Sequence, residues 1–260
     1  MKKTIIIFAL LFGIVPLFTK VNAQIEHDTL TIMTYNIQKQ SYSENGKVIA
    51  SVKPDVVAVQ EIRNILSSSL SILKKETGLD GTACATVGST FLNSYYGIGL
   101  LWNPKLGTPT IKKVKIKSSK VDPDSQRAYI LAEFKNFCII STHYSLVPTD
   151  QIIMTNTILN DEVVQNCINS GKPIYIAGDL NPREEDNRAS LQLFAANGFE
   201  ILNDMDSPKH ATRESGGRPD LILEKNPNPN REVIYRGVPD SADRTYTISD
   251  HLPYVVKVKK

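Results

Sequence analysis

Short apolar runs recur along this chain of 260 residues, and each is closed by Pro, Gly or a polar side chain. Runs of this length and flanking predict buried β-strands. The clearest covers residues 174–177, which lie between Pro173 and Gly178 and lead directly into Asp179. We predict further strands over residues 30–35, 55–59, 97–102, 127–134, 137–140, 218–223, 232–238 and 254–258.

Helical patterns separate some of these strands. A run that ends at Gly78 has apolar residues on one side, and a shorter run is stopped by Pro54. The predicted helices cover residues 47–52, 62–77, 150–169 and 189–196. Because strands dominate and helices lie between them, we expect a single α/β domain with its strands in the middle and its helices outside.

Residues 112–120 hold five lysines, interleaved with Val114 and Ile116. Lysine-rich strands protect the edges of sheets from unwanted pairing, so an edge strand is the first interpretation. A patch that attracts phosphate is the alternative.

The N-terminus has the pattern of a secretory signal peptide. Lys2 and Lys3 precede an uncharged apolar run over residues 5–18, and residues 21–23 resemble a small-residue cleavage site. The run is too short for a comfortable membrane span, which needs about 20 residues. We therefore expect residues 1–23 to be removed, residues 24–260 to form one catalytic domain, and the protein to be periplasmic or secreted.

Charge and cysteine content narrow the function classes. The chain has 30 basic and 27 acidic residues, and three of the lysines lie in the signal segment, so the remainder is neutral (27 − 27 = 0). Neutrality argues against coating nucleic acid by net charge alone, although a local basic groove is compatible with it. Cys84, Cys138 and Cys167 have no zinc-site spacing, and one disulfide plus a free thiol or three buried thiols are both open.

Polar side chains of a few types stand at or beside the ends of the predicted strands. They are Asn36, Glu61, His143, Asp179, Asn181, Asp220, Asp250 and His251. Each has a structural interpretation on its own; Asn181, for example, is followed by Pro182 and Glu184 and could cap a helix. The recurrence of one pattern, an apolar strand and then Asn, Glu, His or Asp, favours a shared site.

A shared site has a coherent chemistry. Carboxylates such as Glu61 and Asp250 suit a hard divalent cation, which can polarise a phosphoryl oxygen. Asp179 can hold or deprotonate a water molecule, and the Asn181 amide can donate to a phosphate or fix that water.

The two histidines suit acid–base work. His251 with an acidic partner, such as Asp220, would form a base and its orienting group, and His143 could donate to a non-bridging oxygen or protonate a leaving group.

Five short motifs occur in an order that resembles the endonuclease/exonuclease/phosphatase superfamily, whose best-known member is deoxyribonuclease I. They are residues 34–36 (TYN), 59–61 (VQE), 141–143 (STH), 178–181 (GDLN) and 249–253 (SDHLP). The resemblance implies a four-layer α/β/β/α sandwich of two packed, mostly antiparallel (mixed) sheets with outer helices. It also implies a phosphoesterase that depends on Mg²⁺, with Mn²⁺ or Ca²⁺ as alternatives.

The resemblance also implies roles for single residues. The metal ligands would be Glu61, Asn36 and Asp250. The catalytic residues would be His143, Asp179, Asn181, Asp220 and His251. The substrate contacts would be Arg127, Arg63 and Tyr95. One departure concerns His143, because Gly97 stands near the position where deoxyribonuclease I places an acidic partner for its first catalytic histidine.

The leading hypothesis is an exported, monomeric, metal-dependent phosphodiesterase, most simply a deoxyribonuclease I-like endonuclease with nucleic acid as substrate and no stable protein partner. The alternative is a phosphatase or phospholipase-type enzyme acting on inositol phosphates or sphingomyelin-like lipids. A second alternative is a non-catalytic binding module on the same fold. The sequence leaves open the number of metal ions and whether Asp179 or His251 is the general base.

Overall fold

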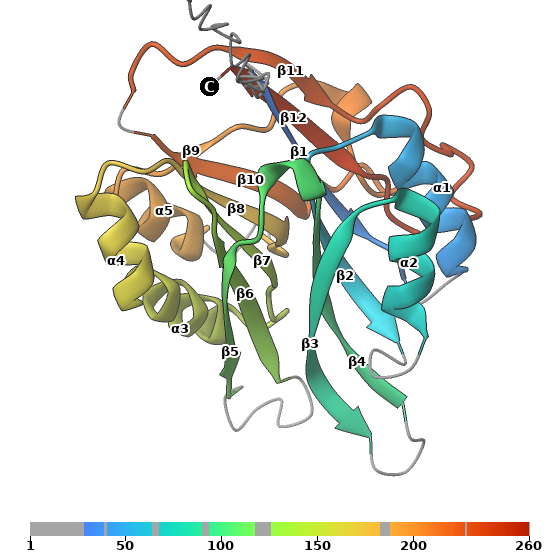
Figure 1. Ribbon diagram of the computed structural model, residues 1–260, viewed down its shortest axis with the longest axis horizontal. Coiled ribbons are helices and arrows are strands. Elements are labelled where there is room, and N and C mark those ends of the chain that lie inside the picture. Colours follow the sequence, from blue (N-terminus) through green and yellow to red (C-terminus); the bar gives the residue numbers. More distant parts are fainter. Residues whose placement is uncertain are drawn as a thin grey trace, which may run out of the picture.

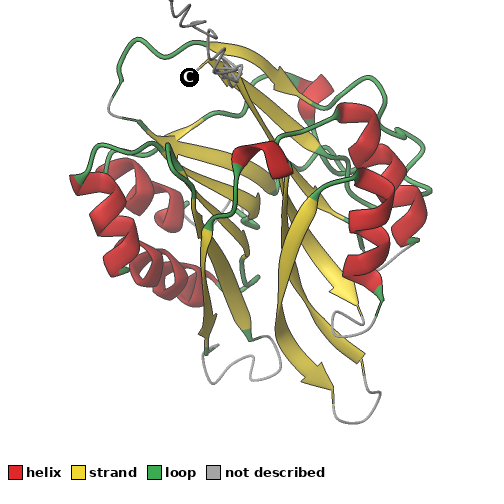
Figure 2. Ribbon diagram, in the orientation of Figure 1, coloured by secondary structure: helices red, strands yellow, loops and turns green. Residues whose placement is uncertain are grey.

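The computed structural model describes residues 29–38, 41–63, 68–89, 94–117, 126–182, 188–226 and 228–259. The expected signal peptide lies outside this range. Two six-stranded sheets pack face to face, and the helices lie on their outer faces (Figures 1 and 2). The expected four-layer sandwich is confirmed.

The first sheet has the strand order β11-β12-β1-β2-β4-β3. Its strands are β1 (Thr29–Asn36), β2 (Val56–Arg63), β3 (Asp80–Ser89), β4 (Ser94–Trp102), β11 (Val233–Gly237) and β12 (Tyr254–Lys259). The second sheet has the order β5-β6-β7-β8-β10-β9. Its strands are β5 (Thr110–Ile116), β6 (Arg127–Glu133), β7 (Cys138–His143), β8 (Ile174–Asp179), β9 (Glu200–Ile201) and β10 (Asp220–Lys225).

Three apolar clusters hold the four layers together. The cluster between the sheets includes Ile32 and Leu100 from one sheet and Ile130 and Ile222 from the other. A second cluster joins the first sheet to α1 (Tyr42–Val52) and α2 (Ser69–Thr77). A third joins the other sheet to α3 (Pro148–Leu159), α4 (Glu162–Asn169) and α5 (Ala189–Ala196). The inner strands of both sheets, such as β7 and β8, are therefore buried on two faces, which explains their continuous apolar runs.

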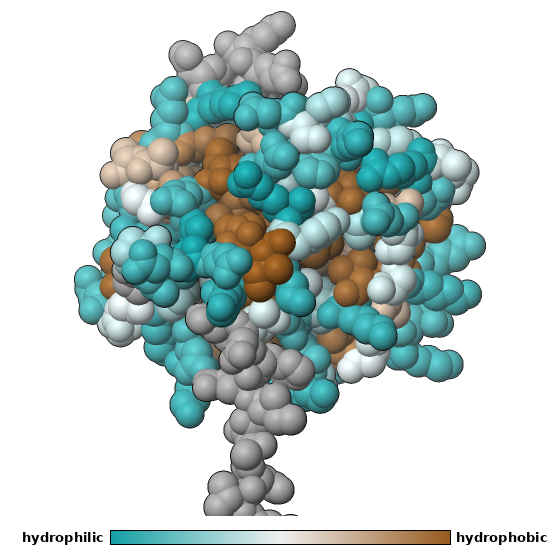
Figure 3. All heavy atoms as spheres, turned by 90° about the horizontal axis from the view of Figure 1, so that it is seen from above, coloured by the Kyte–Doolittle hydropathy of each residue, from teal (hydrophilic) through white to brown (hydrophobic). Residues whose placement is uncertain are grey.

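Each sheet contains one parallel pair, β1 with β2 and β7 with β8. Parallel strands end at the same edge of a sheet, so the residues after these strands are neighbours. In Figure 1 the arrowhead of β2 lies at the lower end of the molecule, and Figure 3 views the opposite end, where hydrophilic residues surround a hydrophobic band.

None of the helices in the described part of the chain is long and apolar enough to cross a membrane.

Several sequence-based boundaries were wrong. Residues 62–63 belong to β2 and not to a helix, because Ile62 is buried in the ladder opposite Gly97; the helix is Ser69–Thr77. The helix expected over residues 150–169 is two helices, because the Asp161 side chain accepts a hydrogen bond from the Val163 N–H (2.9 Å) and starts a new helix there.

Other elements were missed or shorter than expected. Strand β3 was not predicted, since its sequence, DGTACATVGS, is rich in small residues and has no strong alternation. Helix α1 begins at Tyr42, five residues before the expected start. The lysine-rich stretch does form an edge strand, β5.

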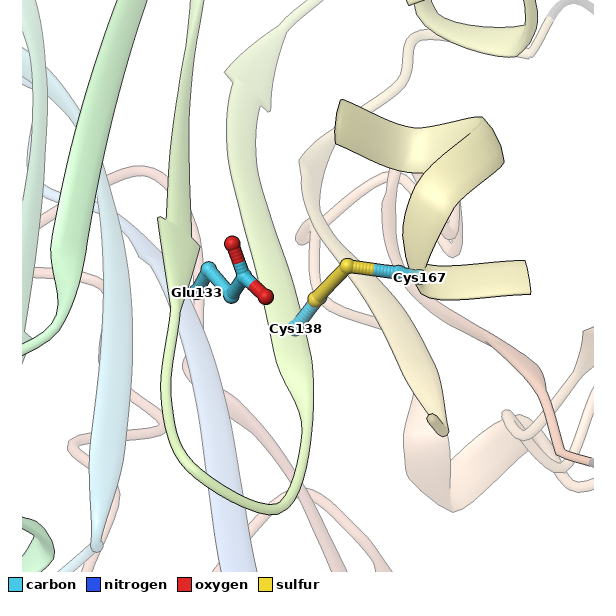
Figure 4. A group of neighbouring side chains, drawn as sticks. All are labelled: Glu133, Cys138 and Cys167. Carbon is cyan, nitrogen blue, oxygen red and sulfur yellow. A yellow bond between two sulfur atoms is a disulfide. The ribbon is translucent and has the colours of Figure 1, made fainter. Parts of the chain in front are cut away.

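Two of the three cysteines form a disulfide. Cys138, at the start of β7, is bonded to Cys167 in α4, and both are buried (Figure 4). Glu133 lies beside the bridge in Figure 4 and pairs with Lys172 at 2.6 Å. Cys84 is a buried free thiol. The disulfide fixes α4 on the sheet whose strands lead to the candidate site.

Candidate active site

Strand β8 delivers Asp179 to the end of the sheet, and Gly178 makes this possible. A Cβ atom at position 178 would overlap the Thr142 carbonyl oxygen and lie 2.9 Å from its carbonyl carbon. Glycine therefore allows β7 and β8 to approach closely just before their final pair, His143 opposite Asp179. On the other side of β8, Asp220 begins β10 opposite the same residue.

Asp179 is the centre of a buried polar cluster. Its Oδ2 accepts a hydrogen bond from Asn36 Nδ2 (3.0 Å). The same oxygen lies 3.6 Å from His143 Nε2 and 3.9 Å from His251 Nε2. Asn36 belongs to the other sheet, so the cluster spans the sandwich. His143 thus has a carboxylate beside it, although Gly97 offers none.

Asp220 pairs with His251. Its Oδ2 lies 2.7 Å from His251 Nδ1, and both side chains are buried. The other oxygen, Oδ1, is buried and has no hydrogen-bond partner among the described residues. An oxygen acceptor at Nδ1 fixes the imidazole and turns Nε2 toward Asp179. The geometry is that of a base and its orienting acid.

A β-bulge directs Glu61 into the site. The register between β2 and β4 shifts between Val59 and Ile62, and Glu61 has a φ of 60°. A bulge turns a side chain away from the regular alternation of a strand. Glu61 Oε1 consequently accepts a hydrogen bond from Asn36 Nδ2 (3.0 Å).

Asn181 lies just beyond β8, in a left-handed conformation with a φ of 46°. Its N–H donates to Asp179 Oδ1 (3.1 Å) and its side-chain amide donates to the Tyr144 carbonyl (3.1 Å). The strand ends at Asp179, so Asn181 belongs to the turn that follows it. The helix-cap alternative involves Glu184, which lies outside the described residues.

Gln151 of α3 supports this turn, and sequence reasoning missed it. Its amide donates to the Asn181 carbonyl (2.9 Å) and to the Ser145 carbonyl (2.8 Å). Gln151 is buried and ties the segment after β7 to the segment after β8. Its position near the start of the helix predicted over residues 150–169 gives no signal of this role.

Asp250 stands at the rim of the cluster. Its N–H donates to Gln38 Oε1 (3.2 Å), and its Oδ2 lies 3.3 Å from Arg213 Nη2. Its Oδ1 is 4.0 Å from His251 Nε2 and is buried without a hydrogen-bond partner in the described part of the chain. Arg213 was not among the expected site residues, because nothing in the sequence links it to position 250.

Burial and neighbouring charges raise two pKa values in the cluster. Burial, followed by the charge of Asp220, raises the pKa of Asp179 to about 6. Burial would lower the pKa of His251, but the charge and hydrogen bond of Asp220, with the charges of Asp179 and Asp250, raise it to about 9. Buried groups whose pKa values are perturbed by specific neighbours are typical of catalytic sites.

The three expected substrate contacts lie on β6, β2 and β4. Arg127 begins β6 and is half-buried, and its Nε is buried without a hydrogen-bond partner among the described residues. Arg63 is exposed at the end of β2, where its main chain bonds to the Tyr42 hydroxyl. Tyr95 lies in β4, and its side chain is outside the described part of the structure.

The donor atoms suit a hard cation. Most are carboxylate and amide oxygens, and the orphaned buried oxygens of Asp220 and Asp250 lack a partner that a cation would supply. Ligand atoms of Asp179, Asp220 and His251 lie within 4.8 Å of one another. The residues present therefore fit a divalent metal ion. Glu133, Cys138 and Cys167 also lie close together, but their thiols form the disulfide.

A family model named the Endonuclease/Exonuclease/phosphatase family matches residues 33–251 of the chain. The chain belongs to this family. The match begins in β1 and ends at His251, so it covers the whole polar cluster. A search of curated protein sequences finds no match. Members of the family are phosphoesterases that generally depend on a metal, and the buried Asp179, Asp220 and His251 group is a candidate catalytic site.

Solved structures share the fold. An endonuclease/exonuclease/phosphatase from Bacteroides vulgatus superposes with a TM-score of 0.69 at 15% identity, covering 88% of this chain and 98% of that one. A mannosyl-6-phosphatase from Bacteroides thetaiotaomicron gives 0.65 at 16% identity, covering 88% and 99%. The catalytic domain of human Nocturnin, with a bound sulfate anion, gives 0.64 at 16% identity, covering 90% and 94%. At these identities the likeness establishes the fold alone.

Proposed function

We propose that this protein is an exported, metal-dependent phosphoester hydrolase and that phosphodiesters of nucleic acid are its first substrate class. The observation that carries the proposal is the buried group in which Asp179 lies beside His143 and His251, with Asp220 on the far side of the His251 ring. A non-catalytic binding module would have no need to bury two histidines among carboxylates, since burying ionisable groups is costly.

The metal would be held by oxygen ligands at the rim of the cluster. Glu61 and Asp250 supply carboxylates, and Asn36 keeps Glu61 in place through its amide. A bound Mg²⁺ would polarise a non-bridging phosphoryl oxygen and stabilise charge on the leaving oxygen.

Two side chains of the protein, Asp179 and His251, would carry out separate proton transfers. With a pKa of about 6, Asp179 is largely ionised near neutral pH and can accept a proton from an attacking water. With a pKa of about 9, His251 is largely an imidazolium and can donate Nε2–H to a phosphate oxygen. Asp179 is thus the proposed general base. The Asn181 N–H holds Asp179 Oδ1, which leaves Oδ2 directed at the cluster.

Two arginines support the proposed substrate class. Arg63 is exposed beside Glu61, and the half-buried Arg127 has an unsatisfied Nε that suits a phosphate. Both arginines favour a substrate whose charged phosphodiester backbone extends past the site. A phosphomonoester is the second candidate. The mannosyl-6-phosphatase with the same fold aligns with 88% of this chain and with 99% of its own, so the two proteins are of similar size.

Export is supported by the Cys138–Cys167 disulfide, since disulfides persist in oxidising compartments. The signal-peptide pattern of residues 1–23 points the same way.

The test is a substrate panel with purified protein in Mg²⁺, with and without a chelator. The panel contains plasmid DNA, an RNA oligonucleotide, mannose 6-phosphate, an inositol phosphate and sphingomyelin. We expect chelator-sensitive nicking of the plasmid, abolished in His251→Ala and retained in His210→Gln, a histidine change outside the cluster. Hydrolysis of only a monoester would favour the second candidate. No hydrolysis of any substrate, or equal rates in wild type and His251→Ala, would refute the proposal.

A further inference from the structure

The connection between β9 and β10 runs alongside the segment that precedes β12. The Leu252 N–H donates to the Thr212 carbonyl at 2.7 Å, and Arg213 forms an isolated antiparallel bridge with His251. These contacts lie between residues far apart in the sequence. They place the backbone of Arg213 directly beside the segment that carries Asp250 and His251.

The Arg213 side chain reaches the carboxylate of Asp250. Its Nη2 lies 3.3 Å from Oδ2, and the two side chains are 42% and 40% exposed. An exposed pair of this kind contributes little to the stability of a fold. Asp250 is the only partner of the Arg213 guanidinium within the described part of the chain. The contact can nevertheless fix the orientation of the Asp250 carboxylate.

The rest of Asp250 is already constrained. Its N–H donates to Gln38 Oε1 at 3.2 Å, so its backbone is tied to the segment after β1. With Oδ2 held by Arg213, the carboxylate presents Oδ1 inward, 4.0 Å from His251 Nε2. That oxygen is buried and has no hydrogen-bond partner among the described residues. An oxygen held in this way is a preorganised ligand position.

We propose that Arg213 is a positioning residue for Asp250, and that it holds one carboxylate oxygen so that the other is offered to the divalent cation. The inference rests on the proposed function, which makes Asp250 a metal ligand. Groups that orient a metal ligand typically contribute 10–100-fold to metal affinity.

Removing Arg213 has two opposing effects on metal affinity, so the direction of the change is informative. A cation beside the site repels Mg²⁺, so its removal alone would tighten metal binding. Loss of orientation would let the half-exposed Asp250 rotate toward solvent and would weaken metal binding. The sign of the change therefore separates a positioning role from simple charge repulsion.

The experiment is calorimetric titration of the purified full chain with Mn²⁺ in the absence of substrate. Arg213→Ala is expected to raise the Kd for Mn²⁺ by about 10–100-fold. Arg213→Lys retains a charge and a donor and should recover most of that loss. Arg236→Ala removes the same charge from an exposed position on β11 and should bind as wild type does. Asp250→Ala gives the reference loss, and the double variant Arg213→Ala/Asp250→Ala should bind no more weakly than Asp250→Ala.

The outcomes are distinct. Tighter or unchanged Mn²⁺ binding in Arg213→Ala, while Asp250→Ala binds more weakly than wild type, would overturn the positioning role and leave the proposed function standing. Unchanged metal affinity with a raised KM would assign Arg213 to the substrate and would also overturn it. Absence of Mn²⁺ and Mg²⁺ binding by wild type would instead count against the proposed function itself.

Discussion

Gly178→Ala tests whether the close approach of β7 and β8 sets the geometry of the site. The added Cβ would overlap the Thr142 carbonyl oxygen and lie 2.9 Å from its carbon and 3.2 Å from its Cγ2. Carbon atoms in ordinary contact are about 3.5–4.0 Å apart. The carbonyl belongs to the backbone of β7, so no change of rotamer relieves the overlap. The strands must separate by about 1 Å.

This separation has two expected effects. Overpacking a core costs about 1–3 kcal/mol, and in a chain of this size each kcal/mol lowers Tm by about 2–4 °C. The next pair in the ladder is His143 opposite Asp179. A displacement of about 1 Å between reacting groups can lower a rate by about 10²-fold. We therefore expect Gly178→Ala to lower kcat by about 10²-fold and Tm by about 2–12 °C.

The assay combines thermal and urea unfolding with kcat on the best substrate of the panel. The matched control is Gly217→Ala, whose Cβ would have its nearest neighbour at 3.7 Å and should leave both quantities unchanged. A Gly178→Ala protein with the Tm and kcat of wild type would refute the steric reasoning. A lower Tm with an unchanged kcat would refute the link between strand spacing and the site.

Three further predictions follow from single contacts. Cys138→Ala/Cys167→Ala opens a loop with a sequence separation of 29 residues and should lower the free energy of unfolding by about 3–4 kcal/mol; equal urea midpoints for this variant and the oxidised wild type would contradict it. Asp220→Asn keeps the shape of the acid but removes the charge that orients the buried imidazole, so kcat should fall by about 10²–10⁴-fold with an unchanged circular dichroism spectrum, and a wild-type kcat would argue against the pairing. Burial would raise the pKa of Asp161, but its hydrogen bond and charge contact with Lys112 help to lower the pKa overall. The ionised Asp161 therefore stabilises the fold at pH values above its ordinary pKa. This stability is lost as the pH falls through the lowered pKa of the folded state. Lys112→Met should therefore lower stability by about 1–3 kcal/mol at pH 7, a difference that shrinks in acid; a difference independent of pH would contradict it.

The layer architecture could be predicted because both sheets bury two faces. Continuous apolar runs such as residues 174–177 and 254–258 need no tertiary information to be read as strands, and they are β8 and β12. Strand β3 was not predicted because its sequence has no continuous apolar run. Its small residues derive their strand state from pairing with β4 over nine positions, and that pairing is not encoded locally.

A predicted helix boundary was wrong where a polar side chain makes contacts that end one helix and begin another. Asp161 is one residue in a long helical pattern, but in the fold it accepts hydrogen bonds from Tyr129 (2.5 Å) and from the Val163 N–H. These contacts end one helix and begin another. Periodicity averages over several turns and cannot report a break made by a single buried carboxylate.

The sequence pattern of polar residues at strand ends suffices to propose the candidate site residues, because parallel strands end at one edge of a sheet. Asn36 and His143 each stand at the last position of a parallel strand, and Asp179 does so too. What the sequence could not show were the contacts that fix them. Gln151 acts through carbonyl groups, and Arg213 acts through one oxygen of Asp250; neither contact leaves a pattern in the chain.

The site also joins the two sheets, and this couples function to packing. The Asn36–Asp179 hydrogen bond links β1 to β8, and Ser249 donates to the Asn36 carbonyl at 2.7 Å. Both contacts are buried, so deleting either side chain would leave unsatisfied polar groups between the sheets and lower stability as well as activity. Asp179→Asn removes the charge of the carboxylate and also replaces one of its two acceptor oxygens by an NH2 group. Because Oδ1 and Oδ2 both accept hydrogen bonds, from the Asn181 N–H and from Asn36 Nδ2, that NH2 group must face a donor. We therefore expect Asp179→Asn to lower both kcat and Tm, and a wild-type Tm would argue against the coupling of the site to the packing of the two sheets.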